Sequence, residues 1–252
     1  MIKGENMKEK GNTVYFDCFD DEIINLYTKK PYDLSKNISL EKKEKEYKEL
    51  SKIYNYQFRI IKPVQKHTNI VKSVTKENIN DDFNDCDGLI TDLKGISLGT
   101  LTADCQAIFL YDPIKKVIGN IHSGWKGTLN RIIENAIKLM ISDYNSNPKD
   151  IIVGICPSIL KCCFEVDEDV KDMFIDDFKD IDTEGCIASG DNNKFYIDTV
   201  KINKQVLLNL GILEHNIHLS NICTKCYKDE FHSHRGALGN AGRNLALIVM
   251  KE

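Results

Sequence analysis

A cysteine and a histidine lie near the two ends of a segment typical of a β-hairpin, TADCQAIFLYDPIKKVIGNIHSGWKGT, which spans residues 102–128. The runs AIFLYD and KVIGNI are strand-like, and the turn between them contains a proline, which suits the second position of a type I turn. A two-residue loop centred on Pro113 and Ile114 predicts that Cys105 faces His122. Directly opposed residues on one face of a hairpin have Cβ atoms about 5 Å apart, so the two side chains are expected to meet.

A thiol and an imidazole that meet in this way are compatible with three roles. They are ligands that Zn²⁺ prefers, they form the nucleophile and base of a cysteine hydrolase, or they are two buried core residues. The surrounding sequence favours a functional role, because Asp104 precedes Cys105 and a glycine-rich GWKG turn follows His122. Backbone N–H groups of that turn, together with Lys126, favour an anion such as phosphate.

The rest of the chain predicts the elements that must position these residues. Helical periodicity predicts helices in SLEKKEKEYKELSKIYNY, in TLNRIIENAIKLMISDY with Thr128 as its N-cap, in DEDVKDMFIDDF and in TVKINKQVLLNLGI. Short apolar runs predict strands in VYFDCF, VQKHTNIV, GLITD, GISLGTLTADC and KDIIVGICPSIL, and a strand or helix in GRNLALIVMKE. The polar stretch TKENINDDFNDCDG predicts a loop. No repeat or linker is visible, so we expect a single α+β domain over residues 1–252, with mixed β-sheets flanked by helices.

Composition excludes several classes of protein. Among the 252 residues, 42% are hydrophobic and 29% are charged, and the net charge is −4, which is ordinary for globular proteins and gives no basic surface for nucleic acid. The N-terminal MIKGENMKEKGN has no apolar segment, and no apolar run has the length of a membrane span. We therefore expect a cytoplasmic protein without nucleic-acid or membrane partners. Nine scattered cysteines, an odd number, indicate reduced thiols rather than a disulfide framework.

Five motifs, in this order, resemble those of the YfiH/laccase-domain family: TADCQAIFLYD, IHSGWKGT, GICPSILKCCFEV, ICT and FHSHRGALGNAGRN. The resemblance extends from about Gln65 to Arg243 and implies a CNF1/YfiH-like fold. Members of this family were first described as polyphenol oxidases or laccases. They are now associated with purine nucleoside phosphorylase activity on adenosine, inosine and methylthioadenosine, and with adenosine deaminase activity. The resemblance thus implies a nucleoside and inorganic phosphate as substrates.

The same resemblance implies the residues of the site. The family holds one zinc ion between a histidine of a QxH segment, the cysteine of TADC and a histidine of HxGW, which correspond here to His67, Cys105 and His122. We expect these residues to be both metal ligands and catalytic residues, because three such ligands leave a fourth position open for chemistry. Lys126 and Arg235 are the candidate phosphate-binding residues, since cationic groups suit phosphate oxygens.

The sequence departs from the family pattern at two of these positions. Lys126 replaces the arginine of HAGWRG, which removes a bidentate donor, and the segment SHRGALG has no second arginine after Arg235. Arg243 is a further candidate for the anion or ribose, and Glu165 is a candidate acid or base. These departures bear on the substrate range and leave the three metal positions intact.

Two alternative functions remain open from the sequence. One is a metal-free cysteine hydrolase in which Cys105 is the nucleophile and His122 the base. The other is a copper-dependent polyphenol oxidase, although six histidines with a single His-x-His are few for several copper centres, so copper is expected less than zinc.

A second group of potential ligands lies in HNIHLSNICTKCYKDEFHSH, which contains His215, His218, Cys223, Cys226, His232 and His234. Cys-x-x-Cys with nearby histidines can form a structural zinc site, but a second Cys-x-x-Cys of the zinc-ribbon type is absent. Cys223 and the FHSHR segment also match motifs of the family that bind no structural ion, so we expect no second ion. The adjacent Cys162 and Cys163 are expected to be two buried thiols, because neighbouring residues of an extended chain point to opposite sides.

Overall fold

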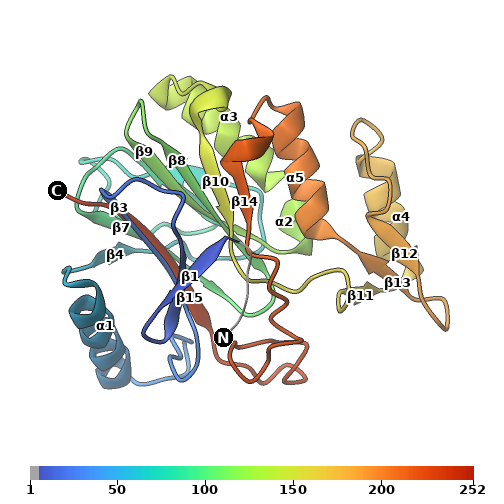
Figure 1. Cartoon of the computed structure of the whole chain (residues 1–252), viewed down its shortest axis with the longest axis horizontal. Coiled ribbons are helices and arrows are strands. Elements are labelled where there is room, and N and C mark those ends of the chain that lie inside the picture. Colours follow the sequence, from blue (N-terminus) through green and yellow to red (C-terminus); the bar gives the residue numbers. More distant parts are fainter. Residues whose placement is uncertain (1–5) are drawn as a thin grey trace.

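The structure, a computed structural model, describes residues 6–252 (Figure 1). Residues 1–5, which begin the N-terminal stretch expected to lack a targeting segment, lie outside the described residues. The fold is α+β with mixed sheets, as predicted. Within the described residues there are two six-stranded sheets and one three-stranded sheet.

The first sheet combines the beginning and the end of the chain. In spatial order it contains β1 (Met7–Lys10), β2 (Thr13–Phe16), β3 (Ile23–Thr28), β15 (Asn244–Met250), β7 (Ile96–Thr102) and β4 (Arg59–Ile61). The segment GRNLALIVMKE is thus a central strand rather than a helix. The predicted helix α1 (Leu40–Tyr54) begins at an N-cap, Ser39, whose side chain accepts a hydrogen bond from the Lys42 N–H group.

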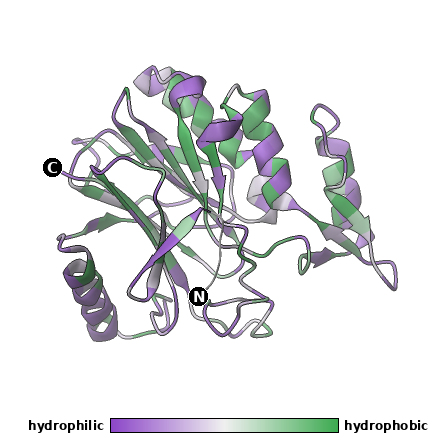
Figure 2. Cartoon of the chain, viewed as in Figure 1, coloured by the Kyte–Doolittle hydropathy of each residue, from purple (hydrophilic) through white to green (hydrophobic). Residues whose placement is uncertain are grey.

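The second sheet carries the hairpin identified in the sequence. Its spatial order is β14 (Ile217–Leu219), β10 (Ile152–Ile155), β8 (Gln106–Asp112), β9 (Val117–Ser123), β6 (Gly88–Thr91) and β5 (Val71–Ser73). Strands β8 and β9 lie in the middle of the sheet, and their residues are buried. Figure 2 shows that the central strands are hydrophobic, whereas the helices carry a hydrophilic face. Among the helices of residues 6–252, none is long and apolar enough to cross a membrane.

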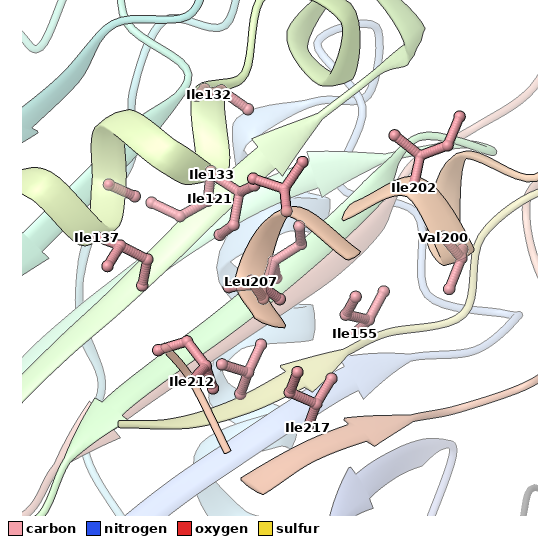
Figure 3. Close-up of a cluster of buried hydrophobic side chains, with 14 of the residues drawn as sticks. Ile121, Ile132, Ile133, Ile137, Ile155, Val200, Ile202, Leu207, Ile212 and Ile217 are labelled. Atoms are coloured by element: carbon pink, nitrogen blue, oxygen red, sulfur yellow. The ribbon is translucent and has the colours of Figure 1, made fainter. Parts of the chain in front are cut away.

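Three hydrophobic clusters hold the layers together. Phe109 of β8 lies between the two sheets with Leu98 and Ile248, while its neighbour Ile108 points to the opposite face. That opposite face is covered by α3 (Ile132–Tyr144) and α5 (Thr199–Asn209), whose isoleucine and leucine side chains contact Ile121 of β9 (Figure 3). The third cluster packs α1 on the first sheet through Leu50. The strand alternation therefore gives both faces of β8 an apolar partner.

A small third sheet projects from one side of the molecule (Figure 1). It contains β11 (Glu165–Val166), β13 (Phe195–Ile197) and β12 (Ile187–Ser189), next to the predicted helix α4 (Glu168–Asp177). Two short 3-10 helices, Pro148–Asp150 and Glu214–Asn216, precede β10 and β14.

The register predicted for the hairpin is wrong by two residues. His122 pairs with Ala107, and Asp112 pairs with Val117, so Cys105 lies just before β8 and has no partner in the β8–β9 ladder. The connecting loop has four residues, 113–116, rather than two.

The aspartate at the end of β8 accounts for the longer loop. One carboxylate oxygen of Asp112 accepts hydrogen bonds from the N–H groups of Ile114 and Lys115 at 2.8 and 2.9 Å, which forms an Asx-type turn. Lys116 then adopts a left-handed φ of 55° before β9 begins. A shift of two residues keeps side chains on the same face of a strand, so Cys105 still approaches the histidine.

Two other local predictions also fail. Only the last residue of VQKHTNIV belongs to a strand, and residues around His67 form an irregular segment in which His67 has a φ of 60°. The helix expected after Thr128 begins earlier, as the short helix α2 (Trp125–Leu129) with Gly124 as its N-cap. Helix α3 starts separately at Ile132. Thr128 instead hydrogen-bonds through its hydroxyl to Ser123 at 2.9 Å.

Candidate functional site

His67, Cys105 and His122 come from three different segments, and the structure brings them together. Their potential ligand atoms all lie within 4.8 Å of one another. The Cys105 Sγ atom is 3.8 Å from His67 Nε2, and the two imidazole rings meet edge to face with centroids 5.0 Å apart. The three side chains therefore form a group with the size and donor types of a metal site.

Cys105 is held in place by the residue before it. Asp104 has a left-handed φ of 87°, and its carboxylate accepts hydrogen bonds from the Thr224 hydroxyl and the Arg235 backbone N–H, both at 2.7 Å. Its own carbonyl accepts a hydrogen bond from Ile159 N–H at 2.8 Å. Three loops from different parts of the chain are thus joined at Asp104, directly beside the thiol.

A buried aspartate, Asp87, positions His67. Its carboxylate accepts hydrogen bonds from the backbone N–H groups of Lys66, His67 and Thr68 at 3.1, 3.0 and 2.7 Å. These donors are unavailable to a strand ladder, which explains why this segment is irregular instead of the predicted strand.

The same aspartate fixes the orientation of His122. Asp87 Oδ1 lies 2.7 Å from His122 Nδ1. Since an ionised carboxylate only accepts hydrogen bonds, Nδ1 is the donor and Nε2 is left to face Cys105 and His67. Asp87 belongs to the segment that is predicted as a polar loop, and its role was not predicted. The available signal was a carboxylate directly before the apolar run GLIT, where burial demands hydrogen-bond partners.

Gly124 allows the three segments to approach one another. A Cβ atom at this position would lie 2.8 Å from His67 Cδ2 and 3.1 Å from Cys105 Sγ. Any other residue type would push against both side chains. The glycine after His122 in the sequence HSGW is therefore required by close contact, not by its φ of −74°.

The side chains of the group carry unusual charges in the metal-free protein. Burial raises the pKa of the Cys105 thiol, but the neighbouring His122 and hydrogen bonds with both imidazoles lower that pKa to about 6. Burial lowers the pKa of His122, but the Cys105 thiolate and Asp87 raise it to about 9. Hydrogen bonds with His122 and Thr68 keep the pKa of Asp87 well below its ordinary value despite its burial. At neutral pH the pair is therefore a thiolate beside an imidazolium.

The group lies in a cavity of about 910 Å³. Among residues 6–252, the lining contains five lysine and arginine side chains but only one carboxylate, that of Asp104, whose two oxygens both accept hydrogen bonds. The cationic residues are Lys36, Lys43, Lys62, Arg235 and Arg243. Trp125, Ile159 and Phe164 give one wall apolar area. Such a surface suits a ligand that has both an anionic part and an apolar part.

Comparison with known proteins assigns the family. Residues 33–251 match the family model described as multi-copper polyphenol oxidoreductase laccase. The chain belongs to this family. Purine nucleoside phosphorylase YlmD of Bacillus subtilis is 32% identical over 197 residues, which cover 75% of this chain and 69% of that protein. The purine nucleoside phosphorylase of Borreliella burgdorferi is 32% identical over 233 residues, which cover 88% of this chain and 92% of that protein.

A solved structure shows the same fold. The crystal structure of Bacillus licheniformis hypothetical protein YfiH matches 97% of this chain and 99% of that chain with a TM-score of 0.88 at 24% identity. The resemblance to the YfiH/laccase-domain family and the α+β fold that it implies are thereby confirmed.

The two candidate phosphate residues of this laccase-family member lie in different environments. Arg235 lines the cavity, its Nη1 group donates to the Glu165 carbonyl at 2.9 Å, and its guanidinium lies 5.5 Å from the Phe164 ring centroid. Lys126 is exposed on α2, with its Nζ atom 5.5 Å from the Trp125 ring centroid, and it is not among the described residues that line the cavity.

The other residues noted in the sequence also differ in their position relative to the cavity. Arg243 and His234 line the cavity. Glu165 is outside its lining, and the Glu165 carboxylate accepts a hydrogen bond from the Tyr196 hydroxyl at 2.9 Å.

A polar wall of the cavity escaped the sequence analysis. Gln106 and Thr199 line the cavity, and the Gln106 amide donates to the Thr199 hydroxyl at 3.0 Å. Asn203 of α5 in turn donates to the Gln106 carbonyl oxygen at 3.0 Å. Because β8 and α5 are distant in sequence, no local pattern indicated this network.

The prediction that Cys162 and Cys163 are buried thiols is wrong. Cys162 is exposed and Cys163 is partly exposed, so they are not buried thiols. Both Sγ atoms lie near Cys226 Sγ, at 3.7 and 3.5 Å, because residues 161–163 form a turn rather than an extended segment. Together with Cys223 they form a group whose four sulfur atoms lie within 4.8 Å of one another.

Proposed function

We propose that this chain is a zinc-dependent purine nucleoside phosphorylase that uses its whole length as one catalytic domain. It would cleave adenosine, inosine and methylthioadenosine with phosphate, with deamination of adenosine as a second reaction. The observation that carries the proposal is the convergence of His67, Cys105 and His122 in a cavity lined by cations. The relatives named purine nucleoside phosphorylases support the substrate class.

The donor set fits a catalytic zinc ion. Two imidazole nitrogens and one thiolate, all within 4.8 Å of one another, suit a tetrahedral ion that keeps one position open toward the cavity. The hydrogen bond from His122 to Asp87 has the form of the carboxylate–histidine contact that supports metal ligands. Zinc held there would supply Lewis acidity to a bound substrate atom.

Phosphorolysis needs a bound anion beside the ribose. An oxygen of hydrogen phosphate attacks the ribose C1′ atom, the bond from C1′ to the base nitrogen breaks, and the base leaves with the proton that the phosphate gives up. We assign phosphate binding to Arg235, whose guanidinium can present paired donors to two oxygens. We assign a second, weaker contact to Lys126, whose exposed side chain on α2 lies outside the cavity lining and would have to turn toward the anion. Asp104 does not serve as the base, because both of its oxygens hold the loops together.

The apolar and polar walls would hold the rest of the nucleoside. Phe164 and Trp125 line the cavity with aromatic side chains, which suit a purine. Gln106 and Thr199 present an amide and a hydroxyl, which suit ribose hydroxyls or base edges. Their hydrogen bonds to each other and to Asn203 keep these groups oriented before a substrate binds.

Product analysis tests the proposal directly. Purified protein of known metal content is incubated with adenosine, inosine and methylthioadenosine, with and without phosphate. The proposal expects free base and an equal amount of ribose 1-phosphate, or its methylthio analogue, only when phosphate is present. Free ribose in both conditions would show that the protein hydrolyses the nucleoside and would contradict phosphorolysis.

A metal-free cysteine hydrolase is the second candidate, and the thiolate–imidazolium pair of Cys105 and His122 favours it. A chelator separates the two. Turnover by a thiol hydrolase survives removal of metal, whereas the proposed zinc enzyme loses turnover and regains it when Zn²⁺ is added.

Copper is the third candidate. Two histidines and one cysteine also hold copper in blue electron-transfer sites. Within the described residues only one of the two potential metal groups contains histidine, which is few for the several copper centres of a laccase. Metal analysis that finds copper, together with oxidation of phenols, would favour that activity instead.

A further inference from the structure

Four cysteines, two of them exposed and one buried, form a second group of potential metal ligands that shares no residue with the candidate catalytic group. Cys162 and Cys163 belong to the turn that precedes β11, while Cys223 and Cys226 flank the beginning of another turn some sixty residues later in the chain. Four of the nine cysteines in the sequence thus gather at one place. Within the described residues the group contains only sulfur ligands.

The sulfur atoms have the spacing of a mononuclear tetrahedral site. A zinc–sulfur bond of about 2.3 Å places the sulfur atoms of a tetrahedron about 3.8 Å apart. The Cys226 Sγ atom lies 3.7 Å from Cys162 Sγ and 3.5 Å from Cys163 Sγ. All four atoms lie within 4.8 Å of one another, so a small contraction would close the shell around one ion.

The backbone holds the two cysteine-bearing segments side by side. Ser158 and Cys223 form a parallel bridge, in which Ser158 N–H donates to the Ile222 carbonyl and Thr224 N–H donates to the Ser158 carbonyl, at 3.2 and 3.0 Å. A hydrogen bond from Tyr227 N–H to the Cys223 carbonyl, at 3.0 Å, turns the chain so that Cys226 comes back toward Cys223. The group is therefore built by the fold and does not depend on flexible side chains meeting by chance.

We propose that Cys162, Cys163, Cys223 and Cys226 form a second metal site, which binds Zn²⁺ as a structural tetrathiolate. Binding releases the thiol protons to solvent and requires no oxidant. Lysines flank the ligands in the sequences KCC and TKCYK, which offsets the net negative charge of four thiolates around a dication. Two of the cysteines are exposed, so the ion has a path from solvent.

The distances disfavour a disulfide as the resting state of the group. A disulfide bond is about 2.05 Å long, and the Sγ atoms are well beyond that distance, with all nine cysteines free. A closed set of four thiolates without a histidine or an open position is also the pattern of structural zinc.

The site would brace one wall of the catalytic cavity. Phe164, which lines the cavity, directly follows Cys163. Thr224, which directly follows Cys223, donates to Asp104 at 2.7 Å, next to Cys105. An ion that joins the two loops would therefore fix the position of the apolar wall relative to the Cys105 segment. Loss of the ion would raise KM for the nucleoside more than it lowers kcat.

The metal content of the 252-residue chain tests this inference. Protein purified with Zn²⁺ present is expected to carry two ions per chain. Cys226→Ser is expected to carry one and to unfold at lower temperature, while the control Cys18→Ser, at a partly buried cysteine outside both groups, keeps both ions. Cys105→Ala is also expected to keep one ion, held by the four cysteines.

Cobalt gives a readout that does not depend on catalysis or on Cys226→Ser folding. Metal-free Cys105→Ala protein titrated with Co²⁺ should develop, at one equivalent, the intense visible bands of a tetrahedral tetrathiolate complex. The inference is overturned if this protein binds no cobalt, or if Cys226→Ser has the same zinc content as the unchanged chain. Mass spectrometry without reductant that finds a disulfide among the four cysteines of freshly purified protein would also overturn it. Because the test uses no substrate, its outcome is independent of the proposed phosphorylase function.

Discussion

The two groups of metal-ligand side chains differ in composition, support and surroundings. His67, Cys105 and His122 offer two nitrogens and one sulfur, and they face a cavity of about 910 Å³. The four cysteines offer a closed set of sulfur atoms from two neighbouring loops, and two of the four residues are exposed. Three ligands with an open side suit a substrate, whereas four ligands suit an ion that only joins loops. If both proposals hold, the number of ligands separates a site that binds substrate from a site that only joins two loops.

The two groups also differ in the residues that hold their potential ligands in place. A buried carboxylate, Asp87, fixes both histidines of the catalytic group. The cysteine group is fixed by backbone hydrogen bonds around Ser158 and Cys223. Charged support of this kind orients a ligand and tunes its basicity, which a purely structural site does not need.

The largest expected effect comes from removing one ligand of the catalytic group. His122→Ala should reduce phosphorolysis to background and remove one zinc ion, while the cysteine group keeps its own. Activity measured with inosine and phosphate, together with metal content, checks the outcome. Retention of both ions by this variant would show that the two groups are not distinct in the way described.

A smaller loss of zinc binding is expected when the Asp87 carboxylate is removed and the three potential ligands stay. Asp87→Asn keeps the size of the side chain but removes the charge that holds His122, so zinc affinity at this site should fall by about 10- to 100-fold. A competition titration with a chromophoric chelator measures the affinity. An unchanged affinity would contradict the role given to Asp87.

The two candidate phosphate residues should differ in effect. Arg235→Ala removes a cation from the cavity and should raise KM for phosphate on the order of 10- to 100-fold, the value of one or two charge-assisted hydrogen bonds. Lys126→Ala, the matched exposed cation, should change KM by only a few-fold. Equal effects from both variants would mean that the anion lies over α2 instead.

The smallest expected effect is the pH dependence of Cys105 alkylation in the metal-free protein. Since the pKa of Cys105 is lowered to about 6, its thiolate fraction and its alkylation rate should rise from pH 5 to 7 and then level off. Burial raises the pKa of Cys18 to about 12, so this cysteine should remain unmodified and serves as the internal reference. Peptide mapping after iodoacetamide treatment reads both sites. A midpoint for Cys105 near that of an ordinary thiol, about 8.5, would contradict the account.

The sequence predicted the elements of the fold better than their exact placement. Helix α1 and strands β8 and β9 follow directly from periodicity. The register of the hairpin was wrong because the Asp112 carboxylate builds a longer turn, an effect of one side chain that alternation does not reveal. His67 was found through the family resemblance alone, since its irregular segment is shaped by a distant residue.

The role of Asp87 and the group of four cysteines were not predicted from the sequence, and the physical cause is the same for both. Asp87 acts on His122, 35 positions away, and Cys162 approaches Cys226 across 64 positions. Neither pair is related by helical or strand spacing, so only the packed sheets bring them together. Local reasoning from the sequence therefore identified ligands by type but not the residues that support them.

Base release from inosine by the 252-residue chain of known metal content, with and without phosphate, tests the proposed zinc-dependent phosphorolysis most directly. We expect hypoxanthine and ribose 1-phosphate in equal amounts, in a reaction that requires phosphate, stops with a chelator and is absent in Cys105→Ala. Release that proceeds without phosphate, or that is unchanged in metal-free or Cys105→Ala protein, would contradict it.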